Sequence, residues 1–535
     1  MSRDGALGAL TQQLAARAVR AVVPWGLGFA VVVYTSAATY AKAYPTLADR
    51  RALARSLTSN VGLTALFGPA RSLDTVAGFA AWRSLGVLTI VGGVWGVLTG
   101  PRLLRGEEDA GRWEAVLGGA LSRRRAALAG VLAGLAAIAG LVVLTAAGAL
   151  IAGRSVSLPV SASFFLALAL TAPAAVFLGV GVLCGQVLPN RRSAVLAAAA
   201  AFGAAYLMRV VAGATSASWL RWLTPIGWTD ATHPLTGSAF APLLALATLF
   251  AVLLGASLLL AGRRDLGTGL VVAERRAPRS RRLLGGVDQL AVRQALPTWL
   301  GWAAGLTVMC SVLGLVAHSV AATTTSSGAM AKVLGRLGTE SGGLRAFLGV
   351  TMITVVSCVA LVGAGYAASI RETESSGLGE TLLVQPVTRG RWLAGRVVAA
   401  ALGITALGAV IGLVTWLAVR GAPGAITLPT MLAAGLNTVP AALLVLGLGV
   451  LAIGVRPRVT AAVAYAVVAW SFLDELVGAV VNAPRWVLDL SLLHHVALAP
   501  AADPRWTTNL VLVVLGVGAA VVGTLAFGRR DLAGA

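Results

Sequence analysis

Side chains able to carry out chemistry are few in this chain of 535 residues. A phosphate-binding P-loop requires Gly-Lys-Ser/Thr, because its lysine reaches the phosphates of a nucleotide. The two lysines are followed by alanine and valine, at Lys42-Ala43 and Lys332-Val333, so neither belongs to such a loop. The sequence also contains no Gly-x-Ser-x-Gly nucleophile turn and no His-Glu-x-x-His zinc motif. We therefore predict that this chain has no catalytic site and no ATP site of its own.

Histidines and cysteines show no clear metal-binding spacing. They are His233, His318, His494, His495, Cys184, Cys310 and Cys358. The cysteines lie in apolar runs and are expected to be small core residues. The adjacent pair His494-His495 either binds a metal or belongs to a polar outer helix, and neighbouring residues on a helix point about 100° apart. The second reading is favoured, so we predict no metal and no cofactor on this chain.

Charged residues gather instead in a polar segment that occurs twice. Residues 105–125 read RGEEDAGRWEAVLGGALSRRR and residues 371–391 read RETESSGLGETLLVQPVTRGR. We call them the first and the second polar segment. Aligned without a gap, they agree at Arg105/Arg371, Glu108/Glu374, Gly111/Gly377, Glu114/Glu380, Leu117/Leu383, Arg123/Arg389 and Arg125/Arg391. Each begins acidic, which suits a helix N-terminus, continues with apolar residues at helical spacing, and ends basic. Ser122 and Thr388 stand where the next helix needs an N-cap. Either the segments dock another protein or they lie on the membrane surface, and the matched glutamates favour docking.

The elements that hold these segments are long apolar runs. Hydrophobic residues make up 58% of the chain and charged residues 12%, whereas a soluble domain carries about 25% charged residues. Runs of about 20 apolar residues recur, and each can cross a bilayer as a helix. We predict an all-α polytopic membrane protein with twelve transmembrane helices, at about residues 21–41, 84–104, 126–152, 162–188, 193–215, 239–261, 297–319, 346–370, 393–419, 428–455, 459–480 and 507–527.

We interpret the net charge of +22 as a sign of membrane orientation and not of binding to nucleic acid. With twelve spans, most basic residues fall on the side that holds both termini and both polar segments, which marks the cytoplasmic face. The same residues are expected to contact anionic lipid head groups. An apolar run near the N-terminus is read as a retained span rather than a cleaved signal peptide, because it has a counterpart in the second half.

The two halves of the chain read as a tandem duplication. Gly262-Arg-Arg-Asp-Leu266 recurs as Gly528-Arg-Arg-Asp-Leu532, each directly after the last span of its half. Six spans per half make the repeat parallel rather than inverted. We predict a first half at 1–261, which starts with an interfacial helix near 6–20, a basic cytoplasmic linker with a second interfacial helix at 262–293, and a second half at 294–535.

The motif Arg371-Glu-x-x-x-x-Gly-x-x-Glu380-x-Leu-Leu-x-x-Pro386-Val-Thr-Arg389 resembles the coupling segment of type-2 ABC exporter permeases. The fused twelve-span form with its basic linker is similar to actinobacterial permeases described as polyketide-antibiotic (tetronasin-type) exporters. The first segment departs from the motif, with Ala120 where the second has Pro386. The resemblance implies that each segment docks on one of two copies of a separate ATPase subunit, which holds the ATP and Mg²⁺. The residues expected to couple are Glu108, Gly111, Trp113, Glu114, Leu117, Arg123, Glu374, Gly377, Glu380, Leu383, Pro386 and Arg389.

Ionisable residues inside predicted spans are further candidates, because burying charge in lipid is costly. Arg209 lies in the fifth span, and its equivalent in the repeat is Glu475, next to Asp474. Tyr206 is likewise equivalent to Phe472. Either Arg209 meets one of these acids between the halves, in the translocation path, or all three charges reach the outer head groups.

The function predicted from these features is the membrane permease of an ATP-driven exporter, in a bacterial plasma membrane, for hydrophobic small molecules such as antibiotics or drugs. Alternatives are an exporter of lipids, a proton-coupled twelve-span carrier and a membrane enzyme acting on lipid-linked substrates. The proton-coupled carrier gives no reason for paired docking segments, and the enzyme lacks clustered catalytic groups.

Overall fold

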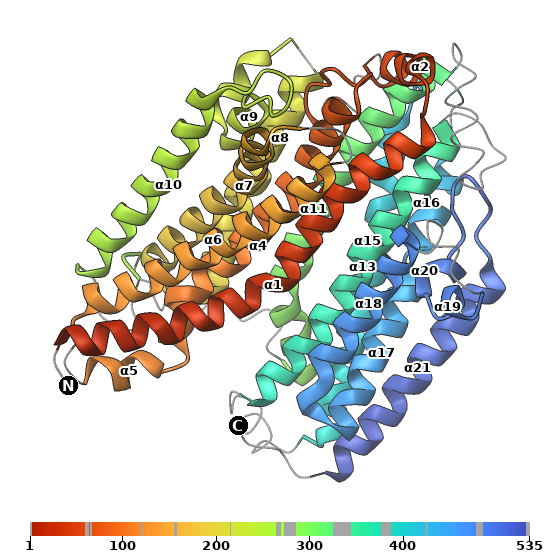
Figure 1. The fold of residues 1–535 in the computed structure, drawn as a ribbon. Coiled ribbons are helices and arrows are strands. Elements are labelled where there is room, and N and C mark those ends of the chain that lie inside the picture. The colour runs from red at the N-terminus through yellow and green to blue at the C-terminus, as the bar shows by residue number, and fades with distance from the viewer. Residues whose placement is uncertain are drawn as a thin grey trace. The chain divides into compact units, whose positions relative to one another are not determined.

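The computed structural model describes residues 3–58, 64, 67–118, 121–154, 158–214, 216–263, 269–271, 285–324, 344–375, 387–422, 424, 426–477 and 485–530. Throughout these residues the regular structure is helical, without strands (Figure 1). The chain divides into two compact units, Met1–Arg276 and Ala277–Ala535. The prediction of an all-helical fold is thus confirmed.

Unit 1 contains ten helices in its described part. They are α1 (Arg3–Ala43), α2 (Leu47–Thr58), α4 (Val76–Asp109), α5 (Arg112–Leu117), α6 (Arg123–Arg154), α7 (Val160–Val187), α8 (Arg191–Ala214), the 3₁₀ helix η1 (Ser218–Leu223), α9 (Pro225–Asp230) and α10 (Phe240–Ala261).

Unit 2 likewise contains ten helices among its described residues. They are α11 (Val287–Thr324), α13 (Leu344–Ser375), α15 (Arg389–Val419), α16 (Leu428–Leu436), α17 (Val439–Val455), the 3₁₀ helix η2 (Pro457–Val459), α18 (Thr460–Val477), α19 (Arg485–Leu488), α20 (Leu492–His495) and α21 (Trp506–Arg529).

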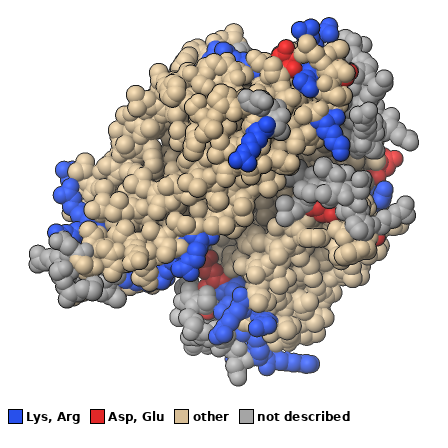
Figure 2. All heavy atoms as spheres, in the orientation of Figure 1, with Lys and Arg blue, Asp and Glu red and all other residues tan. Residues whose placement is uncertain are grey.

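Eleven segments of the described chain are long and apolar enough to cross a membrane. They coincide with eleven of the predicted spans, so the prediction of many apolar helices long enough to span a membrane is confirmed. The remaining predicted span, 459–480, coincides with α18, a helix of 18 residues that is not among the eleven. On the face shown in Figure 2, arginine and lysine gather near helix ends, and uncharged surface covers most of the helix lengths.

Two elements differ from the sequence-based expectation. Residues 6–20 are the first turns of the continuous helix α1 rather than a separate interfacial helix. The predicted span 428–455 is interrupted between α16 and α17. The buried amide of Asn437 lies at this interruption, donates to the carbonyl of Ala497 at 2.9 Å and accepts from the Asn509 amide at 2.8 Å. At the same interruption the Thr438 hydroxyl donates to the Gly435 carbonyl at 2.7 Å, which supplies a partner where the helical ladder stops, as backbone groups in lipid require.

Close packing of helices in unit 1 depends on small residues. α4 lies along α7, and a Cβ at Gly96 would come within 2.6 Å of the backbone of Ala174. α1 lies along α6, and a Cβ added at Gly148 would come within 2.5 Å of the backbone of Ala30. Helices in membranes associate through such contacts, because lipid offers no hydrophobic driving force between them. The first polar segment, between α4 and α6, is therefore joined to two tightly packed helix pairs.

Unit 2 repeats these pairings at equivalent elements. α11 packs on α15 as α1 packs on α6, and α13 packs on α17 as α4 packs on α7. The last span of each unit lies on the equivalent helix, α10 on α7 and α21 on α17. The second polar segment, between α13 and α15, thus has the same connections within its unit as the first.

Candidate functional site

The first polar segment turns sharply between α4 and α5. α4 ends at Asp109, and Gly111 adopts a left-handed conformation with φ of +71°. Glycine accepts this conformation because it has no Cβ. The Gly111 amide donates to the carbonyl of Glu108 at 2.9 Å, and α5 begins at the next residue. Gly111 therefore sets the direction of α5.

The base of this segment is fixed by the buried Arg105. Its guanidinium lies 3.2 Å from the carboxylates of Glu108 and of Asp109, and it donates to the Pro189 carbonyl. Asp109 in turn accepts from the backbone amide of Arg191 at 2.7 Å. Glu108 is 9% exposed. The structure thus gives Glu108 a partner within unit 1 and places it away from the surface that a docking protein would contact.

The surface of the segment is formed by α5 and the turn that follows it. Trp113 is buried against the core of unit 1, and Leu117 packs against the same cluster. The Glu114 carboxylate is exposed. An open surface hollow is lined by Glu114, Leu117, Gly118, Leu121, Ser122 and Arg123. Among the predicted coupling residues of this segment, the structure brings Glu114, Leu117 and Arg123 together around one hollow.

Only the two ends of the second polar segment belong to the described structure. Gly377, Glu380, Leu383 and Pro386 lie outside the described residues. At the start, Glu374 is buried and lies 3.1 Å from Arg371, which repeats the arrangement of Glu108 and Arg105. At the end, Thr388 caps α15, its hydroxyl accepting from the Arg391 amide at 3.4 Å. Thr388 therefore takes the N-cap role predicted for it.

Arg530, which the sequence analysis did not single out, joins the two ends of this segment. Its guanidinium lies 2.5 Å from the Glu374 carboxylate, and its carbonyl accepts from Arg389 at 2.7 Å. The available signal was the repeated Gly-Arg-Arg-Asp-Leu motif, to which Arg530 belongs.

An aromatic stack supports Arg530 from within unit 2. The Arg530 guanidinium lies 5.1 Å from the Phe527 ring centroid, and Phe527 stacks on Trp392 at 5.9 Å. Arg396 lies 4.7 Å from the Trp392 ring. Each guanidinium is attracted to the ring beside it through the ring quadrupole, and the two rings stack on each other. The stack fixes α21 against α15 below the second polar segment.

Arg209 pairs within its own unit, which corrects the pairing expected from the repeat. Its guanidinium binds the Asp230 carboxylate in a two-pronged contact, with Nε to Oδ2 at 2.7 Å and Nη2 to Oδ1 at 3.0 Å. The side chains are 3% and 9% exposed, so Arg209 does not extend to head groups as the other alternative supposed. Tyr206 lies beside Arg209, with its ring centroid 5.8 Å from the guanidinium carbon. Asp474 is buried, whereas Glu475 and Phe472 are exposed on unit 2.

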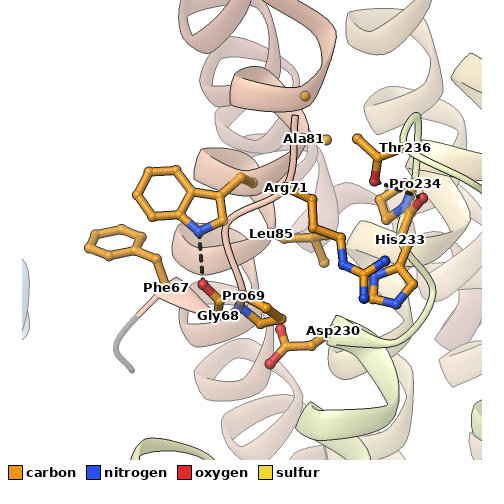
Figure 3. A pocket seen from close by; sticks show the side chains of 12 residues that line it. Phe67, Gly68, Pro69, Arg71, Ala81, Leu85, Asp230, His233, Pro234 and Thr236 are labelled. Atoms are coloured by element: carbon orange, nitrogen blue, oxygen red, sulfur yellow. Dashed lines mark hydrogen bonds between the residues drawn. The ribbon is translucent and has the colours of Figure 1, made fainter. Parts of the chain in front are cut away.

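A small cavity lies beside this ion pair, and Figure 3 shows Arg71 next to His233 and Asp230 beside Pro69. The Trp82 indole closes one side and donates to the Gly68 carbonyl at 2.9 Å. The cavity volume of about 30 Å³ has room for about one water and none for a drug-sized molecule. Burial, with Arg71 and Arg221 nearby, holds the pKa of His233 below its ordinary 6.5, although Asp230 acts in the opposite direction.

No group of three or more potential metal ligands is found among the residues that the structure describes. His494 and His495 have ring centroids 6.0 Å apart, and His495 hydrogen-bonds the Asp489 carbonyl at 2.8 Å. This hydrogen bond gives the His495 ring a backbone partner within unit 2.

The fold is that of a helical protein with many candidate membrane spans. The chain matches the family model described as "Multidrug efflux system permease Rv1217c, C-terminal domain" over residues 11–260 and 284–528, and it belongs to this family of permeases. It is 29% identical over 498 residues to the multidrug efflux system permease protein Rv1217c of Mycobacterium tuberculosis (strain ATCC 25618 / H37Rv). That alignment covers 91% of this chain and 88% of the relative.

Proposed function

We propose that this protein is the membrane permease of an ATP-driven exporter of hydrophobic small molecules in the bacterial plasma membrane. The observation that carries the proposal is the hollow beside α5, where the exposed Glu114 stands on a base fixed by buried ion pairs. The chain contains no P-loop lysine, so in this proposal another protein binds and hydrolyses the ATP. The family and the name of the relative, a multidrug efflux permease, support export of drugs or antibiotics.

The geometry supports a mechanical role for the first polar segment. A partner that pushes on α5 acts on Trp113, whose side chain is buried in the hydrophobic core of unit 1. Arg105 ties the end of α4 to the turn between α7 and α8 through Pro189. Because α4 packs on α7 and α6 packs on α1, a displacement of α5 is passed to four spans. Packed helices transmit such displacements because protein interiors resist compression.

The second polar segment is the reason to propose two copies of the ATPase subunit. Glu374 and Arg371 repeat the buried pair of Glu108 and Arg105, and the helix pairings of the two units correspond. We infer a tandem duplication with twelve spans, both termini in the cytoplasm, and one ATPase docked at each polar segment. ATP and Mg²⁺ bind to that ATPase in this proposal, and Glu380 is the counterpart of Glu114.

Dye export from living cells tests the proposal. Glu114→Lys and Glu380→Lys reverse two charges at the docking surfaces, and Asp503→Lys reverses an exposed carboxylate of a predicted outer loop as a matched control. We expect the double variant to insert normally and to lose most export of a hydrophobic fluorescent dye, while Asp503→Lys exports like the wild type. Normal export by the double variant contradicts the docking proposal.

The energy source is tested with the wild type in the same cells. Export is measured after an ionophore collapses the proton gradient while cellular ATP is maintained. An ATP-driven exporter continues to work under this condition. Loss of export with ATP unchanged identifies a proton-coupled carrier instead.

A further inference from the structure

A large apolar cavity lies in unit 1, and none of its lining residues belongs to a polar segment. It is lined by α6, α7 and α10, is open to the surface on one side, and has a volume of about 560 Å³. Small-molecule sites in proteins span roughly 300–1000 Å³, so the cavity has the size of a binding site. Residues lining it include Ile138, Ala175, Leu244, Ala247 and Phe250.

Two aromatic contacts hold α10 apart from α7 at the two ends of this cavity. At the start of α10, Phe240 meets Phe165 edge to face, with ring centroids 4.8 Å apart. Further along, Phe250 packs over Gly179, where an added Cβ would come 3.0 Å from the ring. The cavity lies along α10 between these contacts.

The equivalent helices of unit 2 show why the space exists. Continuing the gap-free alignment of the repeat places Gly516 of α21 at the position of Phe250. A Cβ at Gly516 would meet the backbone of Leu444 at 2.9 Å, so α21 lies against α17 nearly as closely as two backbones allow. A phenyl ring at this position in α10 prevents the same approach to α7. The cavity is therefore encoded in the sequence of unit 1.

The lining determines what chemistry the cavity accepts. Its hydroxyl group, on Thr171, donates to the carbonyl of Ala167 at 2.8 Å within α7 and is satisfied there. Water needs two or more polar partners to occupy a cavity, and apolar cavities stay dry. Ligands with polar groups find nothing here to orient them. The cavity suits a long apolar chain.

The cavity opens toward the same surroundings as the exposed surface of α10. Phe240 and Leu244 both line the cavity and are 71% and 69% exposed. In the proposed orientation α10 starts at the outer face, and Phe250 lies about 15 Å deeper at 1.5 Å per residue. In a hydrocarbon core of about 30 Å this range covers the outer leaflet. Acyl chains are the apolar chains that surround α10 at that depth.

We propose that the cavity between α6, α7 and α10 binds an acyl chain of an outer-leaflet phospholipid, which inserts past Leu244 and fills the space that Phe250 holds open. The site shares no residue with either polar segment, and this inference does not depend on the energy source of transport. The resulting lipid site belongs to unit 1, because Gly516 removes the equivalent space in unit 2.

Photolabelling of the full-length protein tests the proposal. The protein is reconstituted in phosphatidylethanolamine vesicles containing a phosphatidylglycerol with a photoactivatable diazirine at mid-chain, and adducts are located by mass spectrometry. We expect labels on inward residues of α7 such as Ala175, which is 9% exposed and lines the cavity. Labels confined to outward residues of α10 would overturn the proposal, since any lipid touching the surface produces them.

A pair of substitutions on one helix gives the matched control. Ala247→Phe places a ring in the cavity, whereas Ala245→Phe adds the same ring at an exposed position of α10 outside the lining. We expect Ala247→Phe to reduce labelling of Ala175 at least fivefold and Ala245→Phe to leave it unchanged. Ala172→Leu, a smaller filling change on α7, should give an intermediate loss if Ala247→Phe fails to fold. Equal labelling in all variants contradicts the proposal.

Competition identifies the occupant. Excess unlabelled phosphatidylglycerol should reduce labelling of Ala175, because it competes for the same site. A hydrophobic fluorescent dye at low micromolar concentration should leave the labelling unchanged. If the dye displaces the label and the lipid does not, the cavity is a cargo site and the assignment to an acyl chain is wrong.

Discussion

Removing the carboxylate of Asp230 should destabilise unit 1 strongly. Asp230→Ala leaves the guanidinium of Arg209, 3% exposed, without its two-pronged partner. Breaking a buried pair in this way costs about 3–5 kcal/mol, or more than about a hundredfold in the unfolding equilibrium. The loss should spread to the segment before α4, because a Cβ at Gly68 would lie 2.5 Å from the Arg209 guanidinium and 2.8 Å from the Asp230 carboxylate.

The structure offers a more exposed ion pair of the same geometry as a control. Arg112 and Glu107 also make a two-pronged contact, at 2.6 and 2.7 Å, but their side chains are 52% and 16% exposed. Breaking an exposed pair costs about 0–1 kcal/mol. Glu107→Ala should therefore change stability far less than Asp230→Ala, although both remove one carboxylate from one arginine.

Reversible unfolding in mixed micelles, followed by tryptophan fluorescence, measures both effects. The double variant Arg209→Met, Asp230→Leu should recover most of the loss, since an apolar pair of similar volume is often as stable as a buried ion pair. The reasoning is refuted if Asp230→Ala unfolds within about 1 kcal/mol of the wild type, the range of an exposed pair. It is also refuted if the double variant is no better than Asp230→Ala.

Two further predictions concern Arg530 and His233. Arg530→Ala removes a charged partner of the buried Glu374 and should lower dye export severalfold at normal protein levels. The neighbouring Arg529→Ala is the control and should not lower export. Equal export by the two variants would contradict a special role for Arg530. Because the pKa of His233 is depressed in the folded state, the unfolded state binds the proton more readily, so stability should be complete above about pH 6.5 and fall as the pH drops below it. His233→Asn tolerates the φ of +42° and should remove this acid-side loss, and unfolding between pH 5 and 8 that shows the same slope in both proteins would exclude His233 as its source.

The spans were predictable because the length and polarity of an apolar run are properties of consecutive residues. The run predicted at 126–152 is α6 at Arg123–Arg154, and the run predicted at 84–104 lies within α4. The cap at Thr388 was also predictable, since capping acts over three residues. Local patterns therefore located the helices that carry the polar segments.

The partners of the charged residues were not predictable, because they depend on contacts between distant elements. No local pattern favoured Asp230, in a short helix after the span, over Glu475 at the equivalent position of the repeat as the partner of Arg209. It likewise could not show that Glu108 is buried by Arg105 while Glu114 is exposed, since both glutamates recur in the two segments. Repetition identified where polar residues matter, and packing decided what each of them does.

The contrast between Phe250 and Gly516 bears on how such a protein can evolve. In a transporter assembled from two copies of one gene product, every mutation alters both copies of a helix seam at once. Two seams encoded on one polypeptide are inherited as separate traits, so selection can widen the seam between α7 and α10 while the seam between α17 and α21 stays closed. A mutation at position 250 is then tolerated or favoured for its effect on unit 1 alone. A single polypeptide that carries both seams thereby has a route to asymmetry that a homodimer does not have.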